Sequence, residues 1–252
     1  MINPNIELDP QVIRFARRSF LVALDNSDRS TGVKALLDVA GLVSGAKIPD
    51  CGDYDTHELG GAVRGVLRAK GDGEIMIDGP QYAQSSYILQ RYISALLPTA
   101  DMLTISADID PQVLRNMAEF LGKIANRTRV YVAGASPEMG KASQSSKRAI
   151  ELCLMFGFAG AMFRAVDLPA LTRHFGDSIS ELDLVCTGVS TESKPGRVYP
   201  NVAFHGGAKR VVLGRSLREC PDAMSYMVAL CQSLDEDLFA EHRIGSDKDT
   251  NI

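Results

Sequence analysis

Residues 184–216 read LVCTGVSTESKPGRVYPNVAFHGGAKRVVLGRS and contain two short apolar runs, each of which ends at a glycine. Between the runs lie a polar loop and a segment with the spacing of a short helix. Strand, loop, helix and strand in this order are typical of two neighbouring parallel strands joined by a crossover. The segment therefore predicts two parallel strands, whose carboxyl ends fall within Val185–Ser190 and Val211–Ser216.

Glycines at both strand ends favour the binding of an anion, because a backbone without a side chain lets N–H groups approach it closely. The loop between the runs carries two cations, and the second run is followed by an arginine, a forked and permanently charged donor. The loops after the last two strands of a (β/α)8 barrel frequently hold phosphate. We expect the contacts to a phosphorylated ligand to come from Thr187, Gly188, Lys194, Arg197, Gly214 and Arg215.

The same alternation of short apolar runs and longer helical segments continues along the chain. Eight such units fit one domain over residues 1–252, because 252 residues and 27.2 kDa are typical of a single (β/α)8 TIM barrel. An extra N-terminal helix, Pro10–Arg18, precedes the first strand and is expected to cover the barrel floor. A doubly wound open sheet is the alternative. The strands are expected at Phe20–Leu24, Leu42–Ile48, Glu74–Ile77, Met102–Ser106, Arg129–Ala133, Ala159–Phe163, Leu182–Cys186 and Arg210–Leu213.

Capping residues and glycines mark the expected ends of the helices. Side-chain oxygens of Ser, Thr, Asp and Asn accept from the first N–H groups of a helix, and glycine commonly follows its last turn. We expect helix starts at Thr56, Asp110, Ser143 or Ser145, Asp167 and Asp222, and helix stops at Gly71, Gly157 and Gly176.

Composition and charge exclude several classes of function. A net charge of −4 argues against a nucleic-acid surface, which needs clustered Lys and Arg. No apolar run is long enough to span a membrane, and the N-terminus lacks the pattern of a signal peptide, so we expect a cytoplasmic protein. Five cysteines without CxxC spacing indicate reduced thiols, with Cys186 a buried structural one. Residues 243–252 are expected to form a flexible tail.

Polar residues also follow several of the earlier expected strands. In a barrel these positions meet at one mouth, where active sites lie. Lys47 stands in the apolar stretch GAKIP, where a lysine is costly unless it faces a carboxylate. The aspartates have a second interpretation as turn or cap residues. The residues concerned are Asp25, Lys47, Asp78, Asp108 and Ser136.

Four motifs resemble those of the orotidine 5′-monophosphate decarboxylase superfamily of barrels. They are LVALD (21–25), GAKIP (45–49), CTGVS (186–190) and VVLGRS (211–216). The resemblance implies that Asp25 contacts a ribose, Lys47 is the active-site lysine of the second strand and Arg215 binds phosphate. It also implies that Ser136 contacts a pyrimidine and that two copies form a homodimer with active sites at the interface.

The third strand departs from this superfamily. Its signature there is D-x-K-x-x-D, in which the lysine delivers a proton to the carbon that loses CO2, whereas residues 78–83 read DGPQYA. Asp78 is retained, Pro80 replaces the lysine, and Ala83 replaces the aspartate that reaches across the dimer. The phosphate loop also differs, with Thr187 in place of proline and Glu192 near a phosphate-contacting glutamine. These changes argue against the usual decarboxylation of orotidine monophosphate.

Two functions remain open from the sequence. The first, which we favour, is a diverged lyase of the decarboxylase type that acts on a nucleotide or sugar phosphate, with Lys47 and Asp78 catalytic and Tyr82 or Asp108 as accessory residues. The second is a non-catalytic nucleotide-binding or scaffold homologue. A magnesium enzyme using Asp78 and Asp108 is a weaker variant of the first, because a third ligand is missing. We therefore expect no metal and no cofactor.

Overall fold

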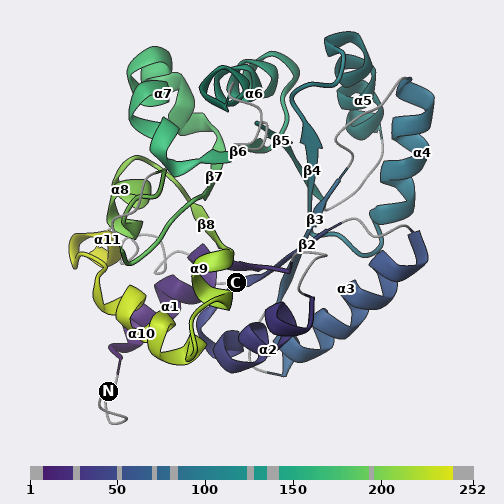
Figure 1. Cartoon of the computed structure of the whole chain (residues 1–252). Coiled ribbons are helices and arrows are strands. Elements are labelled where there is room, and N and C mark those ends of the chain that lie inside the picture. Colours follow the sequence, from purple (N-terminus) through teal and green to yellow (C-terminus); the bar gives the residue numbers. More distant parts are fainter. Residues whose placement is uncertain are drawn as a thin grey trace, which may run out of the picture.

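The computed structural model describes residues 8–24, 29–49, 53–69, 73–79, 85–123, 128–134, 142–192 and 196–240. Eight parallel strands pair in chain order and close into a barrel, with β8 hydrogen-bonded to β1 (Figure 1). The predicted (β/α)8 barrel is confirmed, and the open-sheet alternative is wrong. The strands are β1 Phe20–Ala23, β2 Gly45–Pro49, β3 Glu74–Asp78, β4 Met102–Ser106, β5 Arg129–Ala133, β6 Gly160–Arg164, β7 Asp183–Thr187 and β8 Arg210–Leu213.

Helices surround the barrel (Figure 1), and among the described residues none is long and apolar enough to cross a bilayer. The α-helices are α1 Pro10–Ser19, α2 Arg29–Val39, α3 Asp53–Arg68, α4 Ser86–Leu96, α5 Pro111–Lys123, α6 Ala142–Phe156, α7 Leu168–Phe175, α8 Pro200–His205, α9 Arg215–Arg218, α10 Ala223–Gln232 and α11 Asp237–Ala240. Short 3-10 helices are η2 Ala40–Leu42, η4 Ala165–Asp167 and η5 Gly176–Glu181.

Strands β4, β5 and β8 have the predicted bounds, whereas β2 begins later than predicted. Leu42, the first residue of the predicted strand, instead ends η2 (Ala40–Leu42), which follows α2. Gly45 then opens β2 against β3, because a Cβ there would lie 2.0 Å from the carbonyl oxygen of Glu74. Strands β6 and β7 each begin and end one residue later than predicted.

Most helix ends follow the capping rules. The carboxylates of Asp110 and Asp222 accept from the first turns of α5 and α10, at 2.7 Å and 3.0 Å. Gly157 and Gly176 follow α6 and α7 with φ of +72° and +56°, a left-handed conformation that glycine adopts without strain. The prediction for Thr56 is wrong: α3 begins at Asp53 and Thr56 is fully buried within it.

One other predicted start needs correction and one is confirmed. Helix α6 begins at Ala142, ahead of both serines considered for its start. Asp167 directly precedes α7, as predicted, although its carboxylate makes no capping bond and accepts instead from Ser146 Oγ at 2.9 Å. Gly71 and residues 243–252 lie outside the described residues.

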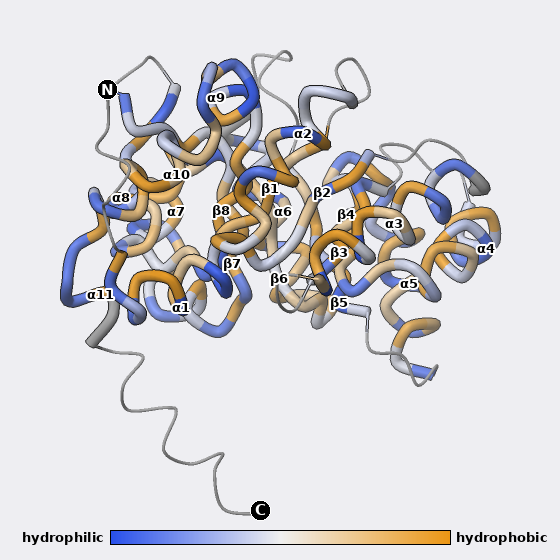
Figure 2. Tube along the Cα trace, turned by 90° about the horizontal axis from the view of Figure 1, so that it is seen from below, coloured by the Kyte–Doolittle hydropathy of each residue, from blue (hydrophilic) through white to orange (hydrophobic). Residues whose placement is uncertain are grey.

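Side chains alternate between the barrel interior and the helical layer, as the pleat of a strand requires. The strand side chains that point outward pack against the helices. Figure 2 shows apolar stretches along the strands and on parts of the surrounding helices. A smaller cluster fills the interior: Leu21, Ala23, Met76, Met102, Tyr131, Ala133, Met162, Val185 and Val212. Residues two positions beyond these, such as Asp78 and Thr187, therefore face the carboxyl-terminal mouth.

Helix α1 covers the opposite end, as predicted. It begins at Pro10, and the carboxylate of Asp9 accepts from Gln11 N at 2.7 Å. Phe15 packs edge-on against Phe204 of α8, with ring centroids 4.9 Å apart. The helix and the amino-terminal ends of β5, β7 and β8 enclose a cavity at the barrel floor.

Candidate functional site

Three adjacent strands bring together a lysine, an aspartate and a threonine at the mouth. Asp78, the last residue of β3, pairs in register with Pro49 of β2 and Thr104 of β4. Lys47 Nζ forms an ion pair with Asp78 Oδ2, and Thr104 Oγ1 donates to Asp78 Oδ1 at 2.8 Å. The predicted pair of catalytic candidates is therefore in direct contact.

This arrangement fixes the carboxylate from both sides. Thr104 is fully buried, and its hydroxyl also accepts from Gly79 N at 3.3 Å, so it has a defined orientation. The side chain of Lys47 is 13% exposed and that of Asp78 is 29% exposed. A largely buried ammonium needs such a counter-charge, because an unpaired buried charge is very costly. Lys47 is thus held at the mouth as a donor, with Asp78 as its acceptor.

The loop after β7 folds back on itself next to this mouth. Gly188 has a φ of +75°, its carbonyl accepts from Val198 N at 3.1 Å, and Ser190 N donates to Val198 O at 3.0 Å. Thr187 Oγ1 donates to Phe163 O on β6 at 3.4 Å. These bonds position the loop that carries Arg197.

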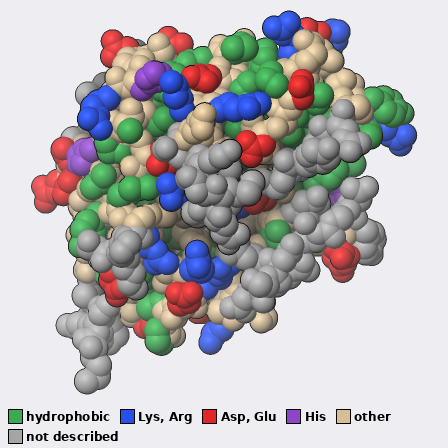
Figure 3. All heavy atoms as spheres, turned by 45° about the horizontal axis from the view of Figure 1, so that its top comes forward, with side chains coloured by type: hydrophobic (Ala, Val, Ile, Leu, Met, Phe, Trp, Pro, Cys, Tyr) green, Lys and Arg blue, Asp and Glu red, His purple; other side chains and the backbone are tan. Residues whose placement is uncertain are grey.

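Arg197 connects the β7 loop to the end of β8. Its Nη1 donates to Ser216 Oγ at 2.5 Å, next to Arg215 in the chain. Gly214 is the cap of α9, and its carbonyl accepts from Leu217 N at 3.1 Å. Arg215 is exposed, and no ion pair involves it within the described ranges. Two guanidinium groups and two glycines thus gather at one edge of the mouth, where Figure 3 shows Lys and Arg side chains beside a hollow.

A third arginine, Arg164, was missed by the sequence analysis. It ends β6, two residues after the interior Met162, and pairs in register with Thr187. Its Nη2 lies 3.4 Å from Asp167 Oδ1, while its Nε is buried with no hydrogen-bond partner among the described residues. The sequence does contain a signal for this residue, because a cation ends the apolar run GAMFR. Arg164 was missed because the predicted strand stopped at Phe163. Thr104 was missed because a threonine in a strand is unremarkable in sequence.

Four predicted site residues lie outside the described part of the chain: Asp25, Tyr82, Ser136 and Lys194. Asp108 is described and lies exposed in the turn after β4, where its N–H donates to Ser106 Oγ at 3.1 Å. No hydrogen bond or ion pair of the described residues links it to Lys47 or Asp78. Since both oxygens of Asp78 are already occupied, the structure gives no support to a magnesium site shared by Asp78 and Asp108.

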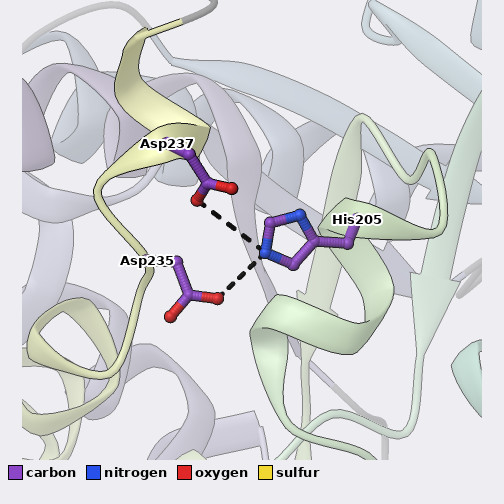
Figure 4. Close-up of side chains that lie close together, drawn as sticks. All are labelled: His205, Asp235 and Asp237. Carbon is purple, nitrogen blue, oxygen red and sulfur yellow. Dashed lines mark hydrogen bonds and ion pairs between the residues drawn. The ribbon is translucent and has the colours of Figure 1, made fainter.

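One cluster in the described ranges could hold a cation, and it lies at the other end of the molecule. His205 Nε2 is 2.9 Å from Asp235 Oδ2 and 3.9 Å from Asp237 Oδ1 (Figure 4). His205 ends α8. All three side chains are exposed, and as they stand they form a polar cluster, with a His205–Asp235 hydrogen bond, that links α8 to the start of α11. The sequence missed this cluster because 30 residues separate the histidine from the first aspartate.

Cys186 is buried, as predicted, and lies on the outward face of β7. Burial, and to a smaller extent the nearby Asp167, raises the pKa of its thiol to about 12. A thiol held neutral in this way is a poor nucleophile at neutral pH. Cys186 therefore contributes packing and no covalent chemistry.

The sequence matches no model of a protein family and no curated protein, but the structure matches solved structures. Orotidine 5′-monophosphate decarboxylase from Methanocaldococcus jannaschii, complexed with the inhibitor BMP, is 14% identical, with a TM-score of 0.64 over 86% of this chain and 99% of that one. The chain has the fold of this decarboxylase. The decarboxylase from Sulfolobus solfataricus is 18% identical, with a TM-score of 0.62 over 87% and 99% of the two chains.

An uncharacterized conserved protein from Geobacillus kaustophilus has the same fold, at 16% identity and a TM-score of 0.60 over 86% of this chain and 100% of that one. The decarboxylase fold therefore spans β1 to β8, the whole stretch over which the four strand-end motifs resemble the superfamily. At these identities the likeness concerns the fold. The ligand and the reaction have to be argued from the side chains at the mouth.

Proposed function

We propose that the mouth of this barrel binds a nucleotide monophosphate or a sugar phosphate, and that the protein is a diverged member of the orotidine 5′-monophosphate decarboxylase superfamily with carbon–carbon lyase activity. The observation that carries the proposal is the Lys47–Asp78–Thr104 arrangement at the mouth. A buried ion pair contributes little to stability compared with apolar packing, so its presence at a strand end favours a functional role.

The phosphate is proposed to lie between the ends of β7 and β8. Gly188 and Gly214 leave room for a close approach to the backbone, and Arg197 and Arg215 supply charge-assisted donors. The unpartnered Nε of Arg164, on the neighbouring β6, supports a third donor on the same side. Three guanidinium groups can neutralise the two charges of a phosphate monoester.

Lys47 is proposed to supply the proton that the strand-three lysine supplies in the superfamily. Pro80 stands at that lysine's position here and has no proton to give. When the carbon–carbon bond breaks, its electron pair stays on the substrate carbon, and that carbon takes a proton from Lys47 Nζ, which water then restores. The ammonium also stabilises the negative charge that develops on the carbon, and Asp78 keeps it in place. Decarboxylation would fit this step, with CO2 as the other product.

A non-catalytic binding protein is the second candidate, and one observation favours it. Both oxygens of Asp78 are already occupied, by Lys47 and by Thr104, so the pair is complete without a ligand. Pro80 and Ala83 would then mark the loss of the superfamily's reaction, with the phosphate site kept for binding alone.

One experiment separates the two candidates. A panel of nucleotide monophosphates and sugar phosphates, orotidine 5′-monophosphate included, is incubated with the wild-type chain and with Lys47→Ala, and products are followed by NMR while binding is measured by calorimetry. The lyase proposal requires conversion of at least one compound, its loss in Lys47→Ala, and binding that survives in the variant. Binding without any conversion by the wild type would establish the second candidate, and full activity of Lys47→Ala would remove Lys47 from the mechanism.

We also propose a cytoplasmic homodimer, by resemblance to the superfamily. The free cysteines that are buried, Cys153, Cys186 and Cys231, support a reducing compartment. Size-exclusion chromatography with light scattering is expected to give about 54 kDa, twice the chain mass of 27.2 kDa. A mass of a single chain at all concentrations would contradict an active site shared between two copies.

A further inference from the structure

The barrel has a cavity at its floor that the proposed function does not use. Its volume is about 500 Å³, and it lies between α1, the amino-terminal ends of β5, β7 and β8, and α11. Catalytic residues are not expected at this end of a (β/α)8 barrel, where side chains ordinarily stabilise the fold. The polar groups around this cavity are nevertheless not all satisfied.

The charges around the cavity do not balance. Four cations line it, Arg18, Arg129, Lys209 and Arg210, against one carboxylate, Asp183. A second carboxylate, Glu74, lies next to the lining and pairs with Arg129 and Arg210. Four positive charges against two negative ones leave an excess of two at a partly enclosed site, where screening by water is reduced.

Two buried polar atoms of the lining have no hydrogen-bond partner among the described residues: Asp183 Oδ1 and Arg210 Nε. The other oxygen of Asp183 is shared by Tyr131 and Arg210, whose hydroxyl and Nη1 both donate to it at 2.7 Å. Arg210 Nε reaches only Glu74 Oε2, at 3.4 Å. Both atoms are themselves buried, so a molecule in the cavity meets Asp183 and Arg210 only through the exposed parts of these side chains, which are 16% and 14% exposed.

The rest of the lining is apolar. Phe15, Phe204 and Leu238 form this part of the wall, and the two rings pack edge-on. A ligand that fits this surrounding has a dianionic group for the cationic side and a carbon skeleton for the apolar wall. We propose that the floor cavity binds a small organic phosphate, independently of the mouth.

The test uses glycerol 3-phosphate as the probe and Arg215→Ala as the background, so that the site proposed at the mouth is impaired. Binding is measured by equilibrium dialysis on the full chain. We expect one molecule to bind per chain in Arg215→Ala, and binding to weaken about tenfold when Arg18→Ala and Lys209→Ala are added, since each removes one rim charge. Both residues are exposed, so the fold is expected to survive their replacement.

The matched control adds Lys123→Ala and Arg173→Ala, two exposed cations of α5 and α7 that do not line the cavity, to the same background. As a second readout, glycerol 3-phosphate should raise the Tm of Arg215→Ala and of the control, but raise that of the Arg18→Ala and Lys209→Ala variant less. Absence of binding in Arg215→Ala, or equal weakening in the control, would overturn the proposal. Neither result bears on Lys47, so the proposed lyase function is tested separately.

Discussion

At the scale of single residues, Thr104 is the group that orients the candidate catalytic pair. It contacts Asp78 and the backbone of Gly79, and it is fully buried, so no water can replace its hydroxyl. In contrast to Lys47, it carries no charge and would not touch a ligand through its own hydroxyl. It therefore acts by positioning Asp78, which in turn positions the ammonium of Lys47.

Thr104→Val keeps the shape of this side chain and removes the hydroxyl. We expect a loss of about 1–2 kcal/mol in the free energy of unfolding, measured in urea, because Asp78 Oδ1 and Gly79 N lose their partner. Any turnover should fall in kcat with little change in KM. Thr104→Ser retains the hydroxyl and should restore both values, so equal behaviour of the two variants would contradict the positioning role.

The buried thiols predict how the stability of the fold depends on pH. Burial raises the pKa of Cys153, Cys186 and Cys231 to about 12, from 9.0 for an exposed thiol. Above pH 9 the unfolded chain loses these protons while the folded chain keeps them, so stability present below pH 9 is lost progressively toward pH 12. Each thiol contributes a slope of up to about 1.4 kcal/mol per pH unit.

Unfolding free energies measured between pH 8 and pH 11 check this prediction. Cys186→Ala should reduce the slope of stability against pH, because it removes one of the three buried thiols with a raised pKa. An unchanged slope in Cys186→Ala would mean that this thiol ionises in the folded chain.

At the scale of elements, the loop after β7 determines where the proposed phosphate-binding groups lie. Gly188 combines a φ of +75° with a close neighbour, since a Cβ there would lie 3.2 Å from the carbonyl oxygen of Gly196. Both features are needed for the loop to return along Val189 and Val198, which form an isolated β-bridge. The path of this loop therefore depends on its glycines, and not only on the cations that it carries.

Gly188→Ala should destabilise the protein by about 1–2 kcal/mol and weaken phosphate binding at the mouth, because alanine is strained at positive φ. Gly122→Ala is the matched control. Gly122 lies on the exposed face of α5 with no atom near its missing Cβ, so alanine there should stabilise the helix by about 0.5–1 kcal/mol. Thermal unfolding distinguishes the two, and equal effects would contradict the account of the loop.

At the scale of the whole molecule, the barrel could be predicted because each strand is a short apolar run, buried on both faces, between segments of helical spacing. The start of β2 could not, because Ala40–Leu42 is as apolar as a strand and its 3-10 turn depends on packing. The Lys47–Asp78 pair was predictable from the cost of burying a lysine and from the resemblance. The charges at the floor were not, since they come from separate strands and only barrel closure brings them together. Arg164 was missed for a different reason, because the predicted strand ended one residue before it.

The central claim is that the ends of β7 and β8 bind the phosphate of a ligand. A crystal of the chain soaked with uridine monophosphate tests it most directly. We expect electron density for the phosphate between Gly188 and Gly214, in contact with Arg197 and Arg215, with the base toward Lys47. Density at the barrel floor alone, or a phosphate at the mouth without contact to either arginine, would contradict it.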